Sequence, residues 1–467
     1  MPEISNVVVL MLENRSFDAM LGRLYPGRAD FKGLSGREFN TWGGKSYPVW
    51  GSSGALTPDD ACIPAPDPSE TFADMTAQIY DAGNQPPSPP TMGGFVANYA
   101  TTQTHRPGDV MHGFSPEQLP VLSELARAFA VCDDWHASAP NQTWPNRLFL
   151  HTGTAGGDVN NTPQHAPYLM DTIFNLLERQ GRTWRIYHHD LPQALALGRI
   201  WEFLPTHLST FDEFLDHAAR GTLANYSFIE PRYFADPLTR SMPNDQHPPH
   251  DVRYGERLIA RCYDALRSGP GWKNTLFLIL YDEHGGIYDH VPPPAAVSPD
   301  DLHQDGFAFD RYGVRIPAVI VSPWVPAGSI VHRPAGSPYP YDHTAVIATL
   351  REIYGLSGNL TQRDAAAPHF LHALSLDRPT NDGPASIPLP MVNPSDIELQ
   401  AAHASRPNAH QQALAQLASA LPSGVTDMAG YLAGGAASTA GTTSAAFDTA
   451  ADAIEQGRKG LMQFLSA

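Results

Sequence analysis

Two segments far apart in the chain each carry paired polar side chains directly after an apolar run. The first run ends at Glu13 and Asn14, and the second ends at Asp282 and Glu283. Apolar runs of this length are typical of central strands in a parallel sheet that is covered on both faces. Because ligands gather at the carboxyl ends of such strands, we expect these side chains to lie together.

Carboxylate and amide oxygens are the ligands that hard divalent cations prefer in proteins. The sequence therefore predicts one or more divalent metal ions held by Glu13, Asn14, Asp282 and Glu283, and with them a metal-dependent hydrolase. Ca²⁺, Mg²⁺ and Mn²⁺ suit such ligands, and Zn²⁺ accepts carboxylates as well, so the identity of the metal stays open. The alternative interpretation is that each acid only caps a helix or lies in a solvated loop.

A hydroxyl side chain that is suited to nucleophilic attack precedes a third element. Thr143 comes two residues before Pro145, which favours an early position in a helix. Free amides at a helix N-terminus attract phosphate, and a metal beside Thr143 would activate its hydroxyl. Asn146 and Arg147 follow and are predicted to hydrogen-bond phosphoryl oxygens. The alternative is an ordinary N-cap threonine with a surface arginine.

Histidines supply candidates for proton transfer. His247 and His343 are the predicted site residues, because histidine donates a proton to an alkoxide leaving group near neutral pH. His250, His284 and His290 are interpreted as loop-bracing residues that could exchange roles with those two.

Composition excludes several classes of partner. The chain has 467 residues, 42% of them hydrophobic, and a formal net charge of −18. That charge argues against nucleic acid as a partner and against broad docking on anionic membranes. A phospholipid or a small phosphoester remains as substrate, with at most peripheral membrane contact.

The compartment is unknown from the sequence. The first strand begins within about six residues of Met1, and no signal peptide or apolar membrane span is recognisable. We therefore expect a soluble protein that is cytoplasmic or exported by a signal-independent route. Cys62, Cys132 and Cys262 have no metal-ligand spacing.

Strands and helices alternate along most of the chain, which favours a mostly parallel sheet between helices. The predicted fold is a three-layer α/β/α sandwich with long covering loops, the longest over residues 26–110. Helices are predicted over 117–127, 171–179 with Asp171 as its cap, 254–267 and 343–354; strands are predicted over 128–132, 183–187, 225–229, 275–281 and 316–321.

The composition changes near the C-terminus. We predict a catalytic domain over residues 1–394 and an Ala-rich extension over 395–467, with a Gly/Ser/Thr linker at 433–445 and a terminal helix. That helix is interpreted as packed on the body or as an oligomer contact. An interfacial helix that seats the protein on lipid is the alternative.

Several of these motifs together resemble the phosphoesterase family, which includes bacterial phosphatidylcholine-type phospholipases C, a bacterial acid phosphatase and plant non-specific phospholipases C. The resemblance rests on the segments 13–18, 143–147, 247–255, 281–294, 313–324 and 342–344, in unbroken order. Within this family, the sequence is most similar to the non-specific phospholipases C.

The resemblance implies an alkaline-phosphatase-like fold and a phosphorylated hydroxyl intermediate on Thr143. It also implies that the four oxygen donors are metal ligands and that His247 and His343 face the phosphate or the leaving group.

The sequence thus predicts a phospholipase C that cleaves a glycerophospholipid to diacylglycerol and a phosphorylated head group. Aromatic residues between 40 and 115 and between 190 and 215 could line an apolar entrance. One alternative is a broad-specificity acid phosphatase, and another is a non-catalytic lipid- or phosphate-binding secreted effector. A sulfatase is disfavoured because no Cys-x-Pro-x-Arg motif is present.

Overall fold

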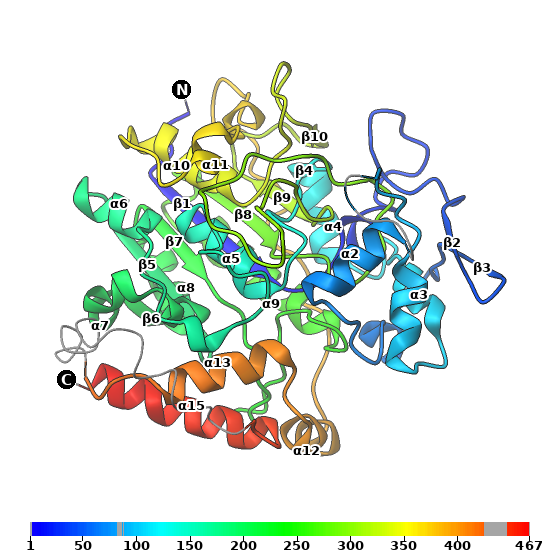
Figure 1. Ribbon diagram of the computed structural model, residues 1–467. Helices are drawn as coiled ribbons and strands as arrows, with labels where there is room; N and C mark the ends of the chain where they lie inside the picture. Colours follow the sequence, from blue (N-terminus) through cyan, green and yellow to red (C-terminus); the bar gives the residue numbers. More distant parts are fainter. Residues whose placement is uncertain (1, 82–85, 87, 425–445, 467) are drawn as a thin grey trace.

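The computed structural model describes residues 2–81, 86, 88–424 and 446–466. Its centre is an eight-stranded sheet with the strand order β10-β4-β9-β8-β1-β7-β5-β6, and helices lie on both faces of it (Figure 1). Strand β9 is antiparallel to both of its neighbours, and the other pairs are parallel. The predicted three-layer fold with a mostly parallel sheet is therefore confirmed.

The strands of this sheet are short except at its centre. Their bounds are β1 Asn6–Leu12, β4 Ala130–Cys132, β5 Trp184–His188, β6 Leu208–Thr210, β7 Tyr226–Ile229, β8 Thr275–Tyr281, β9 Ala318–Val321 and β10 Ser329–Val331. A separate hairpin is formed by β2 Phe39–Trp42 and β3 Lys45–Pro48.

The described helices fall between these strands and after them. They are α1 Phe17–Met20, α2 Phe72–Tyr80, α3 Phe95–Tyr99, α4 Pro120–Ala128, α5 Thr143–Thr152, α6 Ile173–Arg179, α7 Leu204–His207, α8 Phe211–Arg220, α9 Val252–Ser268, α10 Thr344–Tyr354, α11 Gln362–Ala366, α12 Asp396–Ala404, α13 Ala409–Ser419 and α15 Ala450–Leu465.

The two apolar runs form neighbouring strands at the centre of the sheet. All seven residues of β8 are buried, as are six of the seven in β1. The strands pair in parallel, and their last pair is Leu12 with Tyr281. Glu13 and Asp282 are the next residue on each strand, so the register itself sets them side by side.

Two sequence predictions need correction. Thr172, and not Asp171, caps α6, because its hydroxyl and the Asn175 side chain form a reciprocal capping box. The predicted long loop over 26–110 contains the β2–β3 hairpin, α2 and α3 (Figure 1). These elements pack around their own small core, which includes Ile79, Phe95 and Tyr99.

The C-terminal helices α13 and α15 pack along the lower edge of the molecule in Figure 1. Leu414 and Phe464 belong to the same hydrophobic cluster as the central strands. Arg458 also pairs with Asp236 at 2.8 Å. The terminal helix is therefore packed on the body, as one interpretation predicted. The linker predicted at 433–445 lies outside the described residues, and the domain boundary and self-association stay predictions.

In the part of the chain that the structure describes, no helix is long and apolar enough to cross a membrane. The three cysteines are free, and Cys132 and Cys262 are buried.

Candidate active site

Thr143 lies at the first position of α5, directly after the N-cap residue Gln142. Its hydroxyl donates to Oδ1 of Asn14 at 3.4 Å, and the backbone amide of Asn14 donates to Oδ1 of Asp282 at 3.0 Å. These side chains have no solvent exposure. The start of α5 and the ends of β1 and β8 therefore meet in one buried cluster.

Asn14 adopts an unusual backbone conformation in this cluster, with φ at 55°. Gly285 packs against it so closely that a Cβ on Gly285 would lie 2.3 Å from the Asn14 carbonyl oxygen. Gly285 also has a positive φ of 62°, which side chains other than glycine rarely adopt. The glycines after Glu283 thus allow the two strand ends to approach each other.

Arg147 lies between two of the predicted metal ligands. Its guanidinium is 3.2 Å from Oε1 of Glu13 and 3.3 Å from Oδ2 of Asp282, and all three side chains are fully buried. Burial lowers the pKa of Arg147, but the nearby Tyr233, Glu13 and Asp282 outweigh it and raise the pKa overall. In this arrangement the arginine holds both carboxylates.

Asn146 is occupied by the loop that leads into α5. Its Nδ2 donates to the carbonyls of Ala139, Asn141 and Gln142, and its Oδ1 accepts from the Ala139 amide. The Asn146 side chain therefore braces the backbone before Thr143.

His247 lies between two carboxylates. Nδ1 is 3.2 Å from Oε2 of Glu13, and Nε2 is 2.9 Å from Oδ2 of Asp67. Burial opposes protonation of the ring, but Asp67, Glu13 and Glu70 outweigh it and raise the pKa of His247 well above its ordinary value. Both nitrogens then carry protons, as a donor to a leaving group requires.

His343 has a different environment. Nε2 donates to the Asp282 carbonyl at 2.6 Å, while the buried Nδ1 has no hydrogen-bond partner. Burial lowers the pKa of His343. A neutral ring with Nε2 protonated therefore holds the backbone at the end of β8.

Two acids that the sequence analysis did not single out complete the cluster. Asp67 binds His247, and Glu70 accepts a short hydrogen bond from Nδ2 of Asn14. Nε2 of Gln142 also lies 3.5 Å from Glu70. Both acids stand in the proline-rich stretch after Cys62, where no periodic pattern marks a residue for the site.

His410 is the third functional candidate that the sequence analysis missed. It belongs to α13 in the C-terminal extension, is fully buried, and places Nε2 at 3.4 Å from Oε1 of Glu13. Nδ1 accepts a hydrogen bond from the Trp144 indole at 3.1 Å. No motif in the Ala-rich tail distinguishes this histidine.

The donor chemistry of the cluster fits a divalent cation. Oε1 of Glu283 is buried and has no hydrogen-bond donor, and the buried Oε1 of Glu13 accepts no hydrogen bond although the Arg147 guanidinium lies 3.2 Å away. Burial raises the pKa of Asp282 to about 6 and that of Glu70 to about 7, and raises the pKa of Glu283 well above its usual value. Several buried acids that resist ionisation are stabilised by a cation, which neutralises them.

Asp18, Asp289 and His290 form a separate group of possible metal ligands. Among the described residues, it is the one group of acids and histidines whose ligand atoms all lie within 4.8 Å of one another. Glu13, Asp282 and Glu283 are thus more widely spread. However, Arg315 donates to Asp18 at 3.0 Å and to Asp289 at 3.0 Å. Arg315 forms an ion-pair network with these two acids, as Arg147 does with Glu13 and Asp282.

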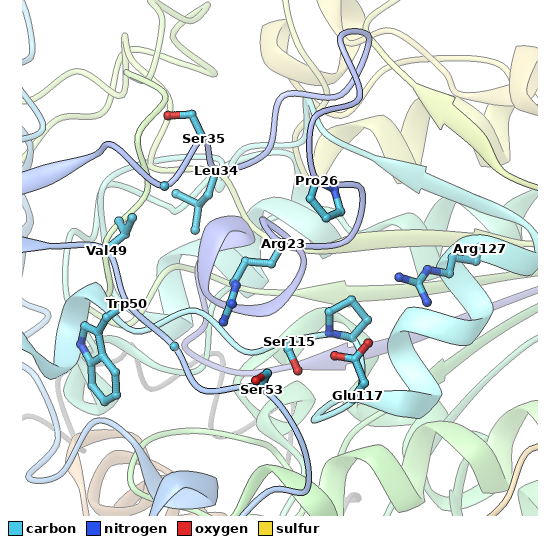
Figure 2. Close-up of a pocket in the computed structure, with 13 residues that line it drawn as sticks. Arg23, Pro26, Leu34, Ser35, Val49, Trp50, Ser53, Ser115, Glu117 and Arg127 are labelled. Atoms are coloured by element: carbon cyan, nitrogen blue, oxygen red, sulfur yellow. The ribbon is translucent and has the colours of Figure 1, made fainter.

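Two cavities are relevant to access. One of about 460 Å³ is bordered by Arg23, Trp50 and Arg127 and touches none of the candidate site residues (Figure 2). A second of about 1030 Å³ is bordered by Asp67, the partner of His247. Of the aromatic residues considered for an entrance, Phe95 and Trp201 are buried, and none lines the second cavity.

Comparisons with known proteins identify the family of this chain. The model of the Phosphoesterase family matches residues 4–357. Non-specific phospholipase C3 from Arabidopsis thaliana is 38% identical over 85% of this chain and 78% of the relative. Non-hemolytic phospholipase C from Pseudomonas aeruginosa is 29% identical over 81% of this chain and 58% of the relative.

The solved structures that were matched are more distant. A protein in the alkaline phosphatase superfamily from Vibrio parahaemolyticus gives a TM-score of 0.35 at 12% identity, covering 53% of this chain and 64% of that one. A phosphonate monoester hydrolase of Agrobacterium radiobacter gives a TM-score of 0.37 at 11% identity, covering 79% of this chain and 77% of that one. On the family match and the sequence relatives, the chain belongs to the Phosphoesterase family and is a phosphoric ester hydrolase related to the phospholipases C.

Proposed function

We propose that this protein is a phospholipase C that cleaves a glycerophospholipid to diacylglycerol and a phosphorylated head group. The observation that carries the proposal is the position of Thr143, whose hydroxyl contacts Asn14 within a buried cluster of acids. The relatives named as non-specific phospholipases C support the choice of substrate.

Glu13, Asn14, Asp282 and Glu283 are the residues proposed to hold a divalent metal ion, and their oxygen ligands suit Ca²⁺, Mg²⁺, Mn²⁺ and Zn²⁺. When bound, such an ion supplies Lewis-acid polarisation of a phosphoryl oxygen and of the Thr143 hydroxyl. Arg147 contacts both Glu13 and Asp282.

In the first displacement, Oγ1 of Thr143 forms a bond to phosphorus and the bond from phosphorus to the glycerol oxygen breaks. His247 gives the departing oxygen a proton from Nε2, in place of its contact with Asp67. We assign the hydroxyl proton to Glu70, which accepts hydrogen bonds from Asn14, the partner of the Thr143 hydroxyl, and from Gln142. Diacylglycerol leaves with the proton from His247.

In the second displacement, water attacks the phospho-threonine. His247, now one proton short, takes a proton from the water, and Glu70 returns its proton to Oγ1 of Thr143. The phosphorylated head group is released and each residue regains its starting state.

The remaining residues position this machinery. Asn146 braces the backbone before Thr143. At the start of α5 the Trp144 amide already donates to Oδ1 of Asn161 at 2.8 Å, and Pro145 has no N–H. His343 holds the Asp282 backbone through Nε2.

Product analysis on phosphatidylcholine in mixed micelles tests the proposal, with each divalent metal added in turn. We expect diacylglycerol and phosphocholine, and we expect both to disappear in Thr143→Ala, while Thr143→Ser keeps part of the activity. Acid-quenched enzyme should carry the phosphorylated head group, phosphocholine, on the peptide that contains Thr143.

Two outcomes would redirect the proposal. Release of phosphate from a simple monoester without lipid cleavage would identify an acid phosphatase. No turnover of either substrate would favour a non-catalytic lipid- or phosphate-binding protein.

A further inference from the structure

A cavity of about 1030 Å³ separates the catalytic core from the C-terminal extension. One wall is formed by the segment from Met242 to Tyr254, and the opposite wall by α12 and the turn that joins it to α13. Residues between Glu398 and Gln411 therefore border the cavity, although the sequence offers no function for this extension. Its volume is at the upper end of the roughly 300–1,000 Å³ that is usual for small-molecule sites.

The inner end of the cavity reaches the candidate active site. Asp67 borders the cavity with a side chain that is 30% exposed, and it accepts a hydrogen bond from the fully buried His247 at 2.9 Å. On the other side of His247, Glu13 lies 3.2 Å away. One carboxylate thus stands between the cavity and the proposed proton donor.

The walls of the cavity are largely apolar. Pro66, Met242, Pro248, Pro249, Val392 and Ala402 are among the residues that line it.

Two of the acids on the walls are already engaged. Asp251 pairs with Arg253 at 2.5 Å, and Glu398 accepts from the Ser395 hydroxyl at the start of α12. An apolar chamber that ends at a carboxylate–histidine pair matches an amphiphile, whose polar ester meets the pair while its hydrocarbon stays in the chamber.

We propose that this cavity receives the acyl chains of the phospholipid, so that the C-terminal extension forms one wall of the lipid-binding site. The proposal rests on the phospholipase C function above. The glycerol oxygen then enters where Asp67 contacts His247, and diacylglycerol leaves through the same chamber after the P–O bond breaks.

The test uses the full-length protein and phosphatidylcholines with butanoyl, hexanoyl and octanoyl chains, with p-nitrophenyl phosphorylcholine as a substrate without chains. For the unaltered protein we expect kcat/KM to rise with chain length, by at most about fourfold per buried methylene. Ala402→Trp fills the cavity from α12 and should lower the ratio of octanoyl-lipid to p-nitrophenyl ester turnover at least tenfold.

Ala404→Trp is the matched control, because Ala404 is exposed on the same helix and does not line the cavity. It should leave the ratio within twofold. Ala401→Trp, at an exposed position that does line the cavity, provides a second variant if Ala402→Trp fails to fold.

An unchanged ratio in both folded cavity variants would overturn the acyl-chain site while leaving the chemistry of Thr143 intact. The proposed function fails separately, if the unaltered protein hydrolyses neither the lipids nor the p-nitrophenyl ester and Thr143→Ala behaves identically.

Discussion

The indole nitrogen of Trp144 donates a hydrogen bond to Nδ1 of His410 at 3.1 Å. Because an indole N–H only donates, Nδ1 is an acceptor, and the neutral ring carries its proton on Nε2. That nitrogen faces Oε1 of Glu13 at 3.4 Å. The residue after the proposed nucleophile therefore fixes the tautomer of a histidine that faces a proposed metal ligand.

Replacing His410 by Phe should weaken divalent metal binding about 10–100-fold, because partners of metal ligands contribute that much to affinity. Trp144→Phe should act in the same direction, since it releases the tautomer. Isothermal titration calorimetry with Mg²⁺, Ca²⁺, Mn²⁺ and Zn²⁺ measures the effect.

His151→Phe is the control for this prediction. His151 is a buried histidine on α5 whose two ring nitrogens have no hydrogen-bond partner. Its replacement should leave metal affinity unchanged. Equal affinities in all three variants would remove His410 from the site.

Replacing Gly285 by Ala should lower turnover at least about 100-fold, because the new Cβ would lie 2.3 Å from the Asn14 carbonyl oxygen and displace that ligand. Gly306→Ala is matched in backbone strain, with φ at 73°, but nothing lies within 4 Å of its Cβ. It should cost only about 1–2 kcal/mol of stability and keep full turnover. Steady-state kinetics on both variants measures this difference. Similar losses of turnover in the two variants would show that backbone strain at a positive φ, and not the contact with Asn14, lowers the activity.

Replacing Arg147 by Met should lower the free energy of unfolding by about 3–5 kcal/mol without metal, because it leaves Glu13 and Asp282 buried without their cation. Added divalent metal should restore part of the loss. Urea unfolding with and without metal measures both effects. Arg28→Met removes an exposed pair with Asp30 and should have no measurable effect. Equal stability of the two variants would contradict the buried pairing.

Replacing Glu256 by Gln should flatten the pH dependence of stability. Burial raises the pKa of Glu256 from 4.5 to about 8, although the Val121 and Leu122 amides donate to it and lower it in part. Between those values the folded protein holds a proton that the unfolded chain releases. Its stability therefore falls as pH rises, by about 1.4 kcal/mol per pH unit, until Glu256 ionises.

Urea unfolding of both proteins at several values between pH 5 and 8 measures this difference. The free energy of unfolding of Glu256→Gln should rise relative to that of the unaltered protein as pH rises, because an amide cannot ionise. Parallel curves would show that Glu256 ionises normally in the fold.

The sequence by itself determined six of the eight strands, the two strand ends and the helix that begins at Thr143, but it did not predict the short edge strands β6 and β10. Apolar runs and helix caps are local signals, and neighbouring parallel strands bring Glu13 and Asp282 into register. Their polar neighbours follow in sequence, so local patterns were enough to propose where this part of the site lies.

Only the tertiary structure decided the rest. Asp67, Glu70 and His410 reach the cluster from a proline-rich loop and from a C-terminal helix, through contacts between residues far apart in the chain. The periodicity of the sequence does not predict such contacts, because loop paths and helix docking depend on the packing of the whole core. The same packing turned Arg147 toward two carboxylates and left a large cavity beside Asp67.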